Sequence, residues 1–231
     1  MPSPTRPRSR SARIVAHRSI PLALPLATAL TAHAAHLIEI DTDGADDGVL
    51  TYNPQFNFGG DTTAASQSVP STALGMTGGD SIFGGDGTGF PDTYVYAYSP
   101  ESQPDNLSIP AGTDLGEGSL ATGLAGGGLG LYRVYATWPF TDNVSGGDVA
   151  YDVVAPGDSF QVDIDQNGRG DAWYLLGEIN YAGGVITVTQ RAGSNTFISM
   201  RAAGVLFEYV PTPGTAALLA LAGVTALRRR R

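Results

Sequence analysis

Apolar and polar residues alternate along short segments through most of the chain between residues 35 and 210. Alternation with a period of two, interrupted by turn residues, is typical of β-strands that bury one face. Eight segments carry this pattern: 37–41, 92–98, 131–138, 149–154, 160–166, 173–179, 185–191 and 197–209. No part of this region offers three turns of helical period. The pattern therefore predicts an all-β sandwich or barrel.

Glycine punctuates the first half of this region, so we expect long loops there around few strands. The stretch 99–130 is especially rich in loop residues, a feature that usually reflects function or mobility. The chain has no cysteine, so disulfides cannot stabilise it. The residues from 35 to 210 are numerous enough to form one domain with its own hydrophobic core.

The N-terminal segment has the three parts of a secretory signal peptide. Five arginines and no acid occupy residues 6–18, and a mostly apolar stretch follows over 20–30. Ala32, His33 and Ala34 then form an A-x-A cleavage site. We expect residues 1–34 to be a signal peptide that directs the chain to the general secretion machinery.

The C-terminal segment has three parts of its own. Pro211, Thr212 and Pro213 precede an apolar run over 216–227, and Arg228, Arg229, Arg230 and Arg231 end the chain. As a helix, that run would be ~18 Å long, well short of the ~30 Å hydrocarbon core of a membrane. Residues 211–231 resemble the PEP-CTERM sorting signal of exopolysaccharide-producing bacteria, with Thr212 in place of the usual glutamate. The resemblance implies removal by an exosortase-type membrane peptidase, transient membrane anchoring, and export to the cell surface or extracellular matrix.

Removal of both terminal segments would change the net charge sharply. The chain has no lysine, and only Arg133, Arg169, Arg191 and Arg201 lie between the two segments. All 22 acids lie there too, so four positive charges against 22 negative charges leave −18 on the mature domain. Such a surface repels nucleic acid and anionic membranes. Such a charge is typical of proteins in a medium rich in salt or divalent cations, and it is equally explained by a need to keep the domain soluble.

The second half of the domain carries a series of short motifs in a fixed order: Tyr-Arg-Val-Tyr at 132–135, Trp138 with Pro139, Asn167 with Gly168, and Trp173 before Leu-Leu-Gly at 175–177. In these motifs the chain resembles a golvesin-like domain, a family similar to the carbohydrate-binding-type module of xanthan lyases. The resemblance covers residues 130–209. It implies a jelly-roll-like antiparallel β-sandwich that is adhesive, binds extracellular polysaccharide and has no catalytic activity. Ala203 and Leu206 replace a charged pair that is usual in the family.

Aromatic residues are candidates for sugar recognition because a sugar ring can stack on them. Trp138 borders Pro139 at the end of a predicted strand, and Tyr135 lies nearby on the same strand. Alternation places Tyr132, Val134, Ala136 and Trp138 on one face of this strand, and Tyr135 on the other. Burial is the alternative fate for Trp138, and we expect it for Trp173.

Four aspartates crowd the loop after the first predicted strand: Asp41, Asp43, Asp46 and Asp47. Carboxylates this close repel one another unless a cation or open solvent lies between them. The loop is therefore either a structural calcium site or a solvated turn. Asp163 and Asp165 begin a second calcium-like pattern, although Asn167-Gly168 at that place also predicts a hairpin turn.

We expect no enzymatic activity. Between the two terminal segments the sequence has no cysteine, no lysine and a single histidine, His36, so Ser–His and Cys–His catalysis lack their residues. Two other hypotheses stay open beside glycan binding. One is a purely structural matrix protein without a specific ligand, and the other is a polysaccharide-cleaving enzyme that uses a carboxylate pair.

Processing at both ends predicts a defined mature mass. Intact-mass spectrometry of the protein from its native host should find a species that begins near Ala35 and lacks Arg228–Arg231. The apolar run is too short for a permanent anchor, which is the physical reason to expect its removal. A mature species that retains the four terminal arginines would contradict the sorting-tail prediction.

Overall fold

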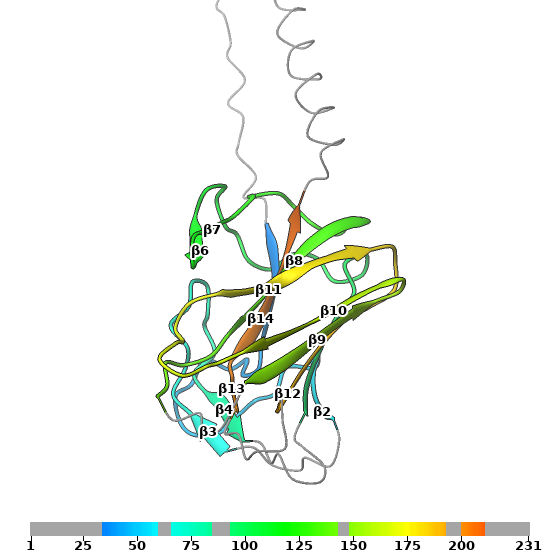
Figure 1. Cartoon of the computed structure of the whole chain (residues 1–231). Coiled ribbons are helices and arrows are strands. Elements are labelled where there is room, and N and C mark those ends of the chain that lie inside the picture. The colour runs from blue at the N-terminus through cyan, green and yellow to red at the C-terminus, as the bar shows by residue number, and fades with distance from the viewer. Residues whose placement is uncertain (1–33, 60–65, 85–92, 143–147, 193–199, 211–231) are drawn as a thin grey trace, which may run out of the picture. The chain divides into compact units, whose positions relative to one another are not determined.

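A computed structural model describes residues 34–59, 66–84, 93–142, 148–192 and 200–210 (Figure 1). All described residues belong to one compact unit, Thr31–Arg231. The predicted signal peptide up to residue 33 and the predicted sorting helix lie outside the described residues. Within the described ranges, no helix is long and apolar enough to cross a membrane.

The described residues form two main antiparallel sheets and two small ones (Figure 1). The four-stranded sheet has the order β1 (Ala35–Glu39), β14 (Gly204–Val210), β8 (Gly130–Thr137), β11 (Tyr174–Tyr181). The five-stranded sheet has the order β10 (Asp158–Ile164), β9 (Val149–Ala155), β12 (Ile186–Ala192), β5 (Thr93–Tyr98), β2 (Phe56–Gly59). A small sheet joins β13 (Met200–Ala202), β4 (Ser81–Gly84) and β3 (Ser66–Ser68), and β6 (Asp114–Gly116) pairs with β7 (Ser119–Leu120).

The connectivity of the two main sheets is that of a jelly roll. Apart from the edge strand β2, eight strands build them, in the chain order β1, β5, β8, β9, β10, β11, β12, β14. Numbered one to eight in that order, the strands of the four-stranded sheet run 1, 8, 3, 6 from edge to edge. Those of the five-stranded sheet run 2, 7, 4, 5 away from β2. This arrangement closes two Greek keys. The predicted all-β, jelly-roll-like antiparallel β-sandwich is confirmed.

Two details of the predicted strands are wrong. The predicted strand at 197–209 is divided, because β13 pairs with β4 whereas β14 pairs with β1 and β8. Ala203 separates them and bonds through its backbone to Ile40 and Thr137. The predicted hairpin at Asn167-Gly168 is instead a crossover from β10 in one sheet to β11 in the other. Gly168 takes φ +66°, and its N–H donates to the carbonyl of Thr141.

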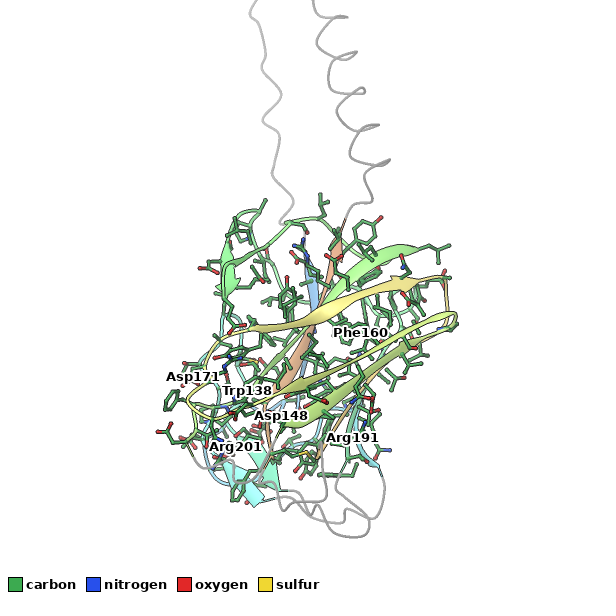
Figure 2. The ribbon with its side chains drawn as sticks, viewed as in Figure 1. Trp138, Asp148, Phe160, Asp171, Arg191 and Arg201 are labelled. Carbon is green, nitrogen blue, oxygen red and sulfur yellow. The ribbon has the colours of Figure 1, made fainter. Side chains whose placement is uncertain are left out.

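The main core lies between the two sheets and is built largely from aromatic rings. Tyr94, Tyr96 and Tyr98 of β5 point inward because alternate residues of a strand share a face, and Phe207 of β14 packs on the Tyr98 ring. Trp138 lies here as well (Figure 2). Its ring stacks on that of Tyr174 at a centroid distance of 4.4 Å. Large rings of this kind bury much apolar area each, which offsets the absence of disulfides.

A second core covers the outer face of the four-stranded sheet. Leu37, Tyr135 and Leu206 point to this side and cluster with Ile109 and Leu115 from the long connection after β5. Trp173 belongs to this cluster, which confirms its predicted core position, and its indole N–H donates to the carbonyl of Leu74. The connection is therefore packed as a layer of the domain, although most of it forms no strand.

Side chains close the sandwich along both open sides. On one side, the Asp158 carboxylate of β10 accepts the backbone N–H of Asn180 in β11 at 2.8 Å, and Phe160 packs on Gly177, where any side chain would collide with the ring. On the other side, His36 of β1 stacks on Tyr98 and contacts the side chain of Gln55, which lies just before β2. These contacts fix the distance between the sheets.

The buried stack of Trp138 predicts a stability effect that its exposed neighbour will not share. Trp138→Ala should lower the free energy of unfolding by about 3–5 kcal/mol, because the cavity cannot collapse between two packed sheets. Phe140→Ala, two residues on and 55% exposed, should change it by less than about 0.5 kcal/mol. Urea denaturation measures both. Similar small losses in the two variants would show that the indole ring is not part of the core.

Candidate functional site

The two aromatic residues predicted to stack on sugars are both buried. Trp138 and Tyr135 have no exposed surface. The Trp138 indole N–H donates to the carbonyl of Arg169, and the Tyr135 hydroxyl donates to the Glu208 carboxylate at 3.0 Å. The assignment of these residues to a binding platform is thus corrected. Both faces of β8 are covered, so neither face of the strand offers a ring to a ligand.

The four aspartates of the acidic loop lie in different environments. Asp41 is fully buried, and its two oxygens accept the backbone N–H groups of Thr51 at 2.9 Å and Gly79 at 3.0 Å. Asp43, Asp46 and Asp47 are exposed. The pKa of Asp43 is held below its usual range by hydrogen bonds from the Thr51 hydroxyl and then from the Ala45 N–H.

These carboxylates do not meet at one point in the structure. Asp47 accepts the N–H of Val49 in a local turn, while Asp41 faces the domain interior. Among the residues that the structure describes, no three carboxylates or histidines are grouped so as to hold a metal ion. The calcium site at Asp41, Asp43, Asp46 and Asp47 stays a prediction.

The predicted processing residues lie at the margins of the described domain. Ala34 is buried just before β1, and its N–H donates to the carbonyl of Leu107 at 2.9 Å. Ala32 and the tail residues Pro211, Thr212, Pro213 and Arg228–Arg231 are outside the described residues. The predicted domain bounds of 35 and 210 coincide with the first residue of β1 and the last residue of β14.

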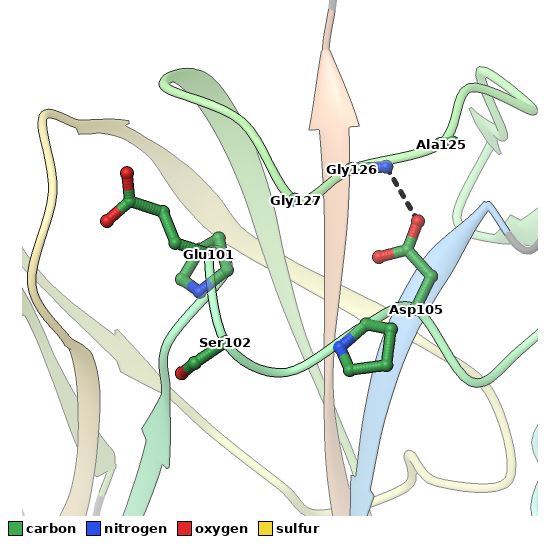
Figure 3. Close-up of a pocket in the computed structure, with 8 residues that line it drawn as sticks. Glu101, Ser102, Asp105, Ala125, Gly126 and Gly127 are labelled. Atoms are coloured by element: carbon green, nitrogen blue, oxygen red, sulfur yellow. Dashed lines mark hydrogen bonds between the residues drawn. The ribbon is translucent and has the colours of Figure 1, made fainter.

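A pocket of about 420 Å³ lies at the end of the sandwich where β14 ends and β8 begins (Figure 3). One wall is the turn after β5, and the other is the glycine-rich segment before β8. The lining residues are Pro100, Glu101, Ser102, Pro104, Asp105, Ala125, Gly126 and Gly127. Two carboxylates and one hydroxyl therefore lie around a single concave surface, and no lining residue carries a positive charge.

The first wall of the pocket is held rigidly at both ends. Near its start, the N–H groups of Ser102 and Gln103 donate to the carbonyl of Ser99, and the Gln103 side chain accepts the Ser99 N–H at 2.6 Å. Just after the wall, the amide of Asn106 pairs with both backbone groups of Leu37, as a neighbouring strand would. The side chains of Glu101 and Asp105 are thus presented on a short, braced segment.

The second wall is fixed through Tyr132 and Asp105. The Asp105 carboxylate accepts the N–H of Gly126 at 2.6 Å (Figure 3). The N–H of Gly127 donates to the Tyr132 hydroxyl, which in turn donates to the carbonyl of Gly128. Burial, with the nearby Asp105 charge, raises the pKa of Tyr132 to about 12. A side chain at position 126 would come within 3.0 Å of the Asp105 carboxylate, so glycine permits this close approach.

One tyrosine hydroxyl lies near the acidic wall. The Tyr181 hydroxyl donates to the carbonyl of Gly184 at 3.1 Å and lies 3.5 Å from the Glu101 carboxylate. Burial raises the pKa of Tyr181, and the Glu101 charge raises it further. Ionised carboxylates only accept hydrogen bonds. The pocket therefore suits a neutral ligand that carries several hydroxyl donors, and it disfavours an anion.

The outer face of the five-stranded sheet is a second polar surface. A row in direct register crosses all five strands through Asn57, Val95, Thr189, Asp152 and Gln161. In the next row, the Arg191 guanidinium donates to both oxygens of Asp152, at 2.7 and 3.4 Å. The charges of Arg191 and Asp152 therefore satisfy each other.

Sequence reasoning did not single out Glu101 or Asp105. Their only signal was the loop-rich stretch 99–130, which was expected to be functional or mobile. The pocket needs residues more than twenty positions apart, and no local motif joins them.

The scattered geometry of the acidic loop predicts the response to calcium. Melting temperatures in millimolar calcium and in sodium at matched ionic strength should be equal, because Asp41 and Asp43 already accept hydrogen bonds from the protein. Asp43→Ala with Asp46→Ala should then melt alike in both salts. A calcium-specific rise that this double variant abolishes would locate a site in the loop. A rise that survives it would point to Asp163 and Asp165.

No family model and no curated protein matches this sequence. Several solved structures are similar to it. A Paenibacillus xanthan lyase has a TM-score of 0.48 and 18% identity over 78% of this chain and 13% of the lyase. A Phanerochaete chrysosporium exo-β-1,3-galactanase has a TM-score of 0.38 and 14% identity over 75% of this chain and 29% of the enzyme. TmCBM61, in complex with β-1,4-galactotriose, has a TM-score of 0.33 and 17% identity over 67% of this chain and 83% of the TmCBM61 chain. Likenesses at this level support no conclusion about what this chain binds.

Proposed function

We propose that this chain is an exported, non-catalytic β-sandwich that binds extracellular polysaccharide through the pocket formed by Glu101, Ser102 and Asp105. The observation that supports the proposal most is the pocket itself: a braced concave surface with two carboxylates, a hydroxyl and two prolines. Its volume of about 420 Å³ lies in the range of roughly 300–1,000 Å³ that is usual for sites that bind small molecules.

A sugar combines the properties that such a pocket would select. Its hydroxyl groups donate hydrogen bonds, which Glu101 and Asp105 can accept in their ionised form. Its ring carbons present an apolar face, which can pack against proline. Bonds between a charged and a neutral group are stronger than those between two neutral groups. The fixed positions of both walls reduce the entropy lost on binding.

The proposal of a non-catalytic role rests on what surrounds the histidine and the carboxylates. His36 is buried, and its Nδ1–H donates to the carbonyl of Pro104, while Nε2 contacts the Gln55 amide. It is therefore committed to closing the sandwich. Asp105 holds Gly126, which is a structural use of the carboxylate.

The geometry of β1 also constrains when a signal peptide could be removed. Ala34 would be the residue on the leader side of the cut, and it is buried against Leu107. A peptidase needs an extended, accessible segment, so cleavage would precede folding. This order agrees with transport of an unfolded chain by the general secretion machinery, followed by folding outside the cytoplasm. An exosortase-type peptidase would then act on the tail that follows β14.

Isosteric changes in the pocket should weaken binding without disturbing the fold. On a glycan array, the full-length protein should bind at least one neutral extracellular polysaccharide. Asp105→Asn and Glu101→Gln should each reduce affinity at least tenfold, about 1.4 kcal/mol, because the ionised acceptor is lost.

Asp148→Asn is the matched control, since it removes one exposed negative charge at the start of β9 (Figure 2). It should bind as the unchanged protein does. Absence of binding to every polysaccharide would favour the purely structural matrix protein. Release of sugars from a bound polymer would instead favour a carboxylate-pair enzyme.

A further inference from the structure

Arg201 differs from the other arginines of the domain in having no carboxylate partner among the described residues. Arg133 pairs with Glu178 at 3.1 Å, and Arg169 and Arg191 pair with Glu117 and Asp152. The domain carries many more acids than bases, so a cation without an acid beside it is unexpected. Its surroundings indicate what could neutralise it.

Neutral groups hold the Arg201 guanidinium in place. Its Nε–H donates to the Thr141 hydroxyl at 2.9 Å, and one Nη1–H donates to the Ser68 hydroxyl at 3.1 Å. The central carbon lies over the ring of Phe83, 5.0 Å from its centroid. Such a contact orients a guanidinium but leaves its charge in place. These groups come from β3, β4 and the segment after β8, so the position depends on tertiary structure.

The backbone of Arg201 is fixed equally firmly. The Gln166 side chain accepts the Arg201 N–H at 2.8 Å, and the Arg201 carbonyl accepts N–H groups from Gln166 and Gln190 at 2.9 and 2.8 Å. Both glutamines are buried. The arginine therefore starts from a rigid base, and little side-chain freedom remains to be lost when a ligand binds.

The remaining donors of Arg201 form a free edge. A guanidinium has five N–H groups, and two of them donate to Thr141 and Ser68. The other three, on Nη1 and Nη2, find no acceptor within the described ranges. Burial lowers the pKa of Arg201, and no neighbouring acid offsets it, whereas Asp152 raises the pKa of Arg191. Two N–H groups side by side match the two oxygens of an oxyanion.

We propose that Arg201, together with Ser68, Thr141 and Phe83, binds the carboxylate or sulfate group of an acidic polysaccharide. The free Nη1 and Nη2 edge would take the two oxygens, and the hydroxyls of Ser68 and Thr141 would hold the guanidinium behind it.

This anion site is separate from the acidic pocket. The pocket lies before the start of β8 and beside the end of β14, whereas Thr141 follows β8 and Arg201 precedes β14. The two sites thus occupy opposite ends of the sandwich, with Arg201 near β3 and β4 (Figure 2). Their opposite charge preferences would let one domain contact a neutral sugar and an acidic sugar at different ends, as a cross-link between polymers requires.

The strongly negative domain sets the conditions of the test. Long-range repulsion opposes an acidic polymer, but salt at about 0.15 M limits it to about 8 Å, while a direct, half-buried contact is screened less. Isothermal titration of the full-length protein at that salt would use oligogalacturonate for carboxylates, dextran sulfate for sulfate esters, and unmodified dextran as the neutral probe.

We expect binding to at least one of the two acidic probes, and the stronger of the two identifies the anionic group. Arg201→Gln should lose that affinity at least tenfold. Arg191→Gln is the matched control, because it removes the same charge from an arginine that already has a partner, and it should change affinity less than twofold. Arg201→Lys keeps the positive charge but loses the planar pair of N–H donors, so it should bind more weakly than the unchanged protein. An unchanged melting temperature would show that its fold is intact.

Two results would overturn the proposal. One is the failure of the unchanged protein to bind either acidic probe. The other is equal affinity of the unchanged protein and both Arg201 variants. Asp105→Asn should leave acidic-probe binding intact, so a failure of the pocket and a failure of the anion site can be told apart.

Discussion

Burial of both faces of the four-stranded sheet is the constraint on which the rest of the structure depends. An ordinary sandwich leaves the outer face of each sheet in water, but here Tyr135 and Leu206 point outward and are fully buried. Among the described residues, Ile109 and Leu115 of the long connection between β5 and β8 cover them, together with Ala73 and Trp173. That connection must therefore follow a defined path, held by Ile109, Leu115 and Trp173.

The candidate glycan pocket is a consequence of this path. Because the connection is packed down, its two ends return to the same end of the sandwich, one after β5 and one before β8. Asn106 adds it to the edge of β1, and Tyr132 holds the glycine segment. The pocket is thus made by loops, yet its walls are supported by the core. Binding groups on loops that rest on a rigid scaffold are a common arrangement in proteins.

The buried charged side chains of the domain differ in the groups that offset their burial. Buried carboxylates such as Asp41 and Glu208 accept backbone N–H groups, which compensates their burial. Glu39 receives the same support from Thr77, although burial still raises its pKa. Within the described ranges, Arg201 is compensated by hydroxyls and a ring rather than by a carboxylate. That contrast, rather than the total charge, distinguishes the proposed anion site.

The sequence by itself indicated the eight strands of the jelly roll, because period-two alternation reflects which side chains can share a sheet face. It also indicated that Trp173 is core. It did not indicate β2, β3, β4, β6 or β7. It could not show that Trp138 and Tyr135 are both buried, since alternation separates two faces without revealing that both are covered. Nor could it show that Asn167-Gly168 crosses between sheets. The pocket and the Arg201 site join residues that are far apart in the chain, and only tertiary packing decides which of them meet.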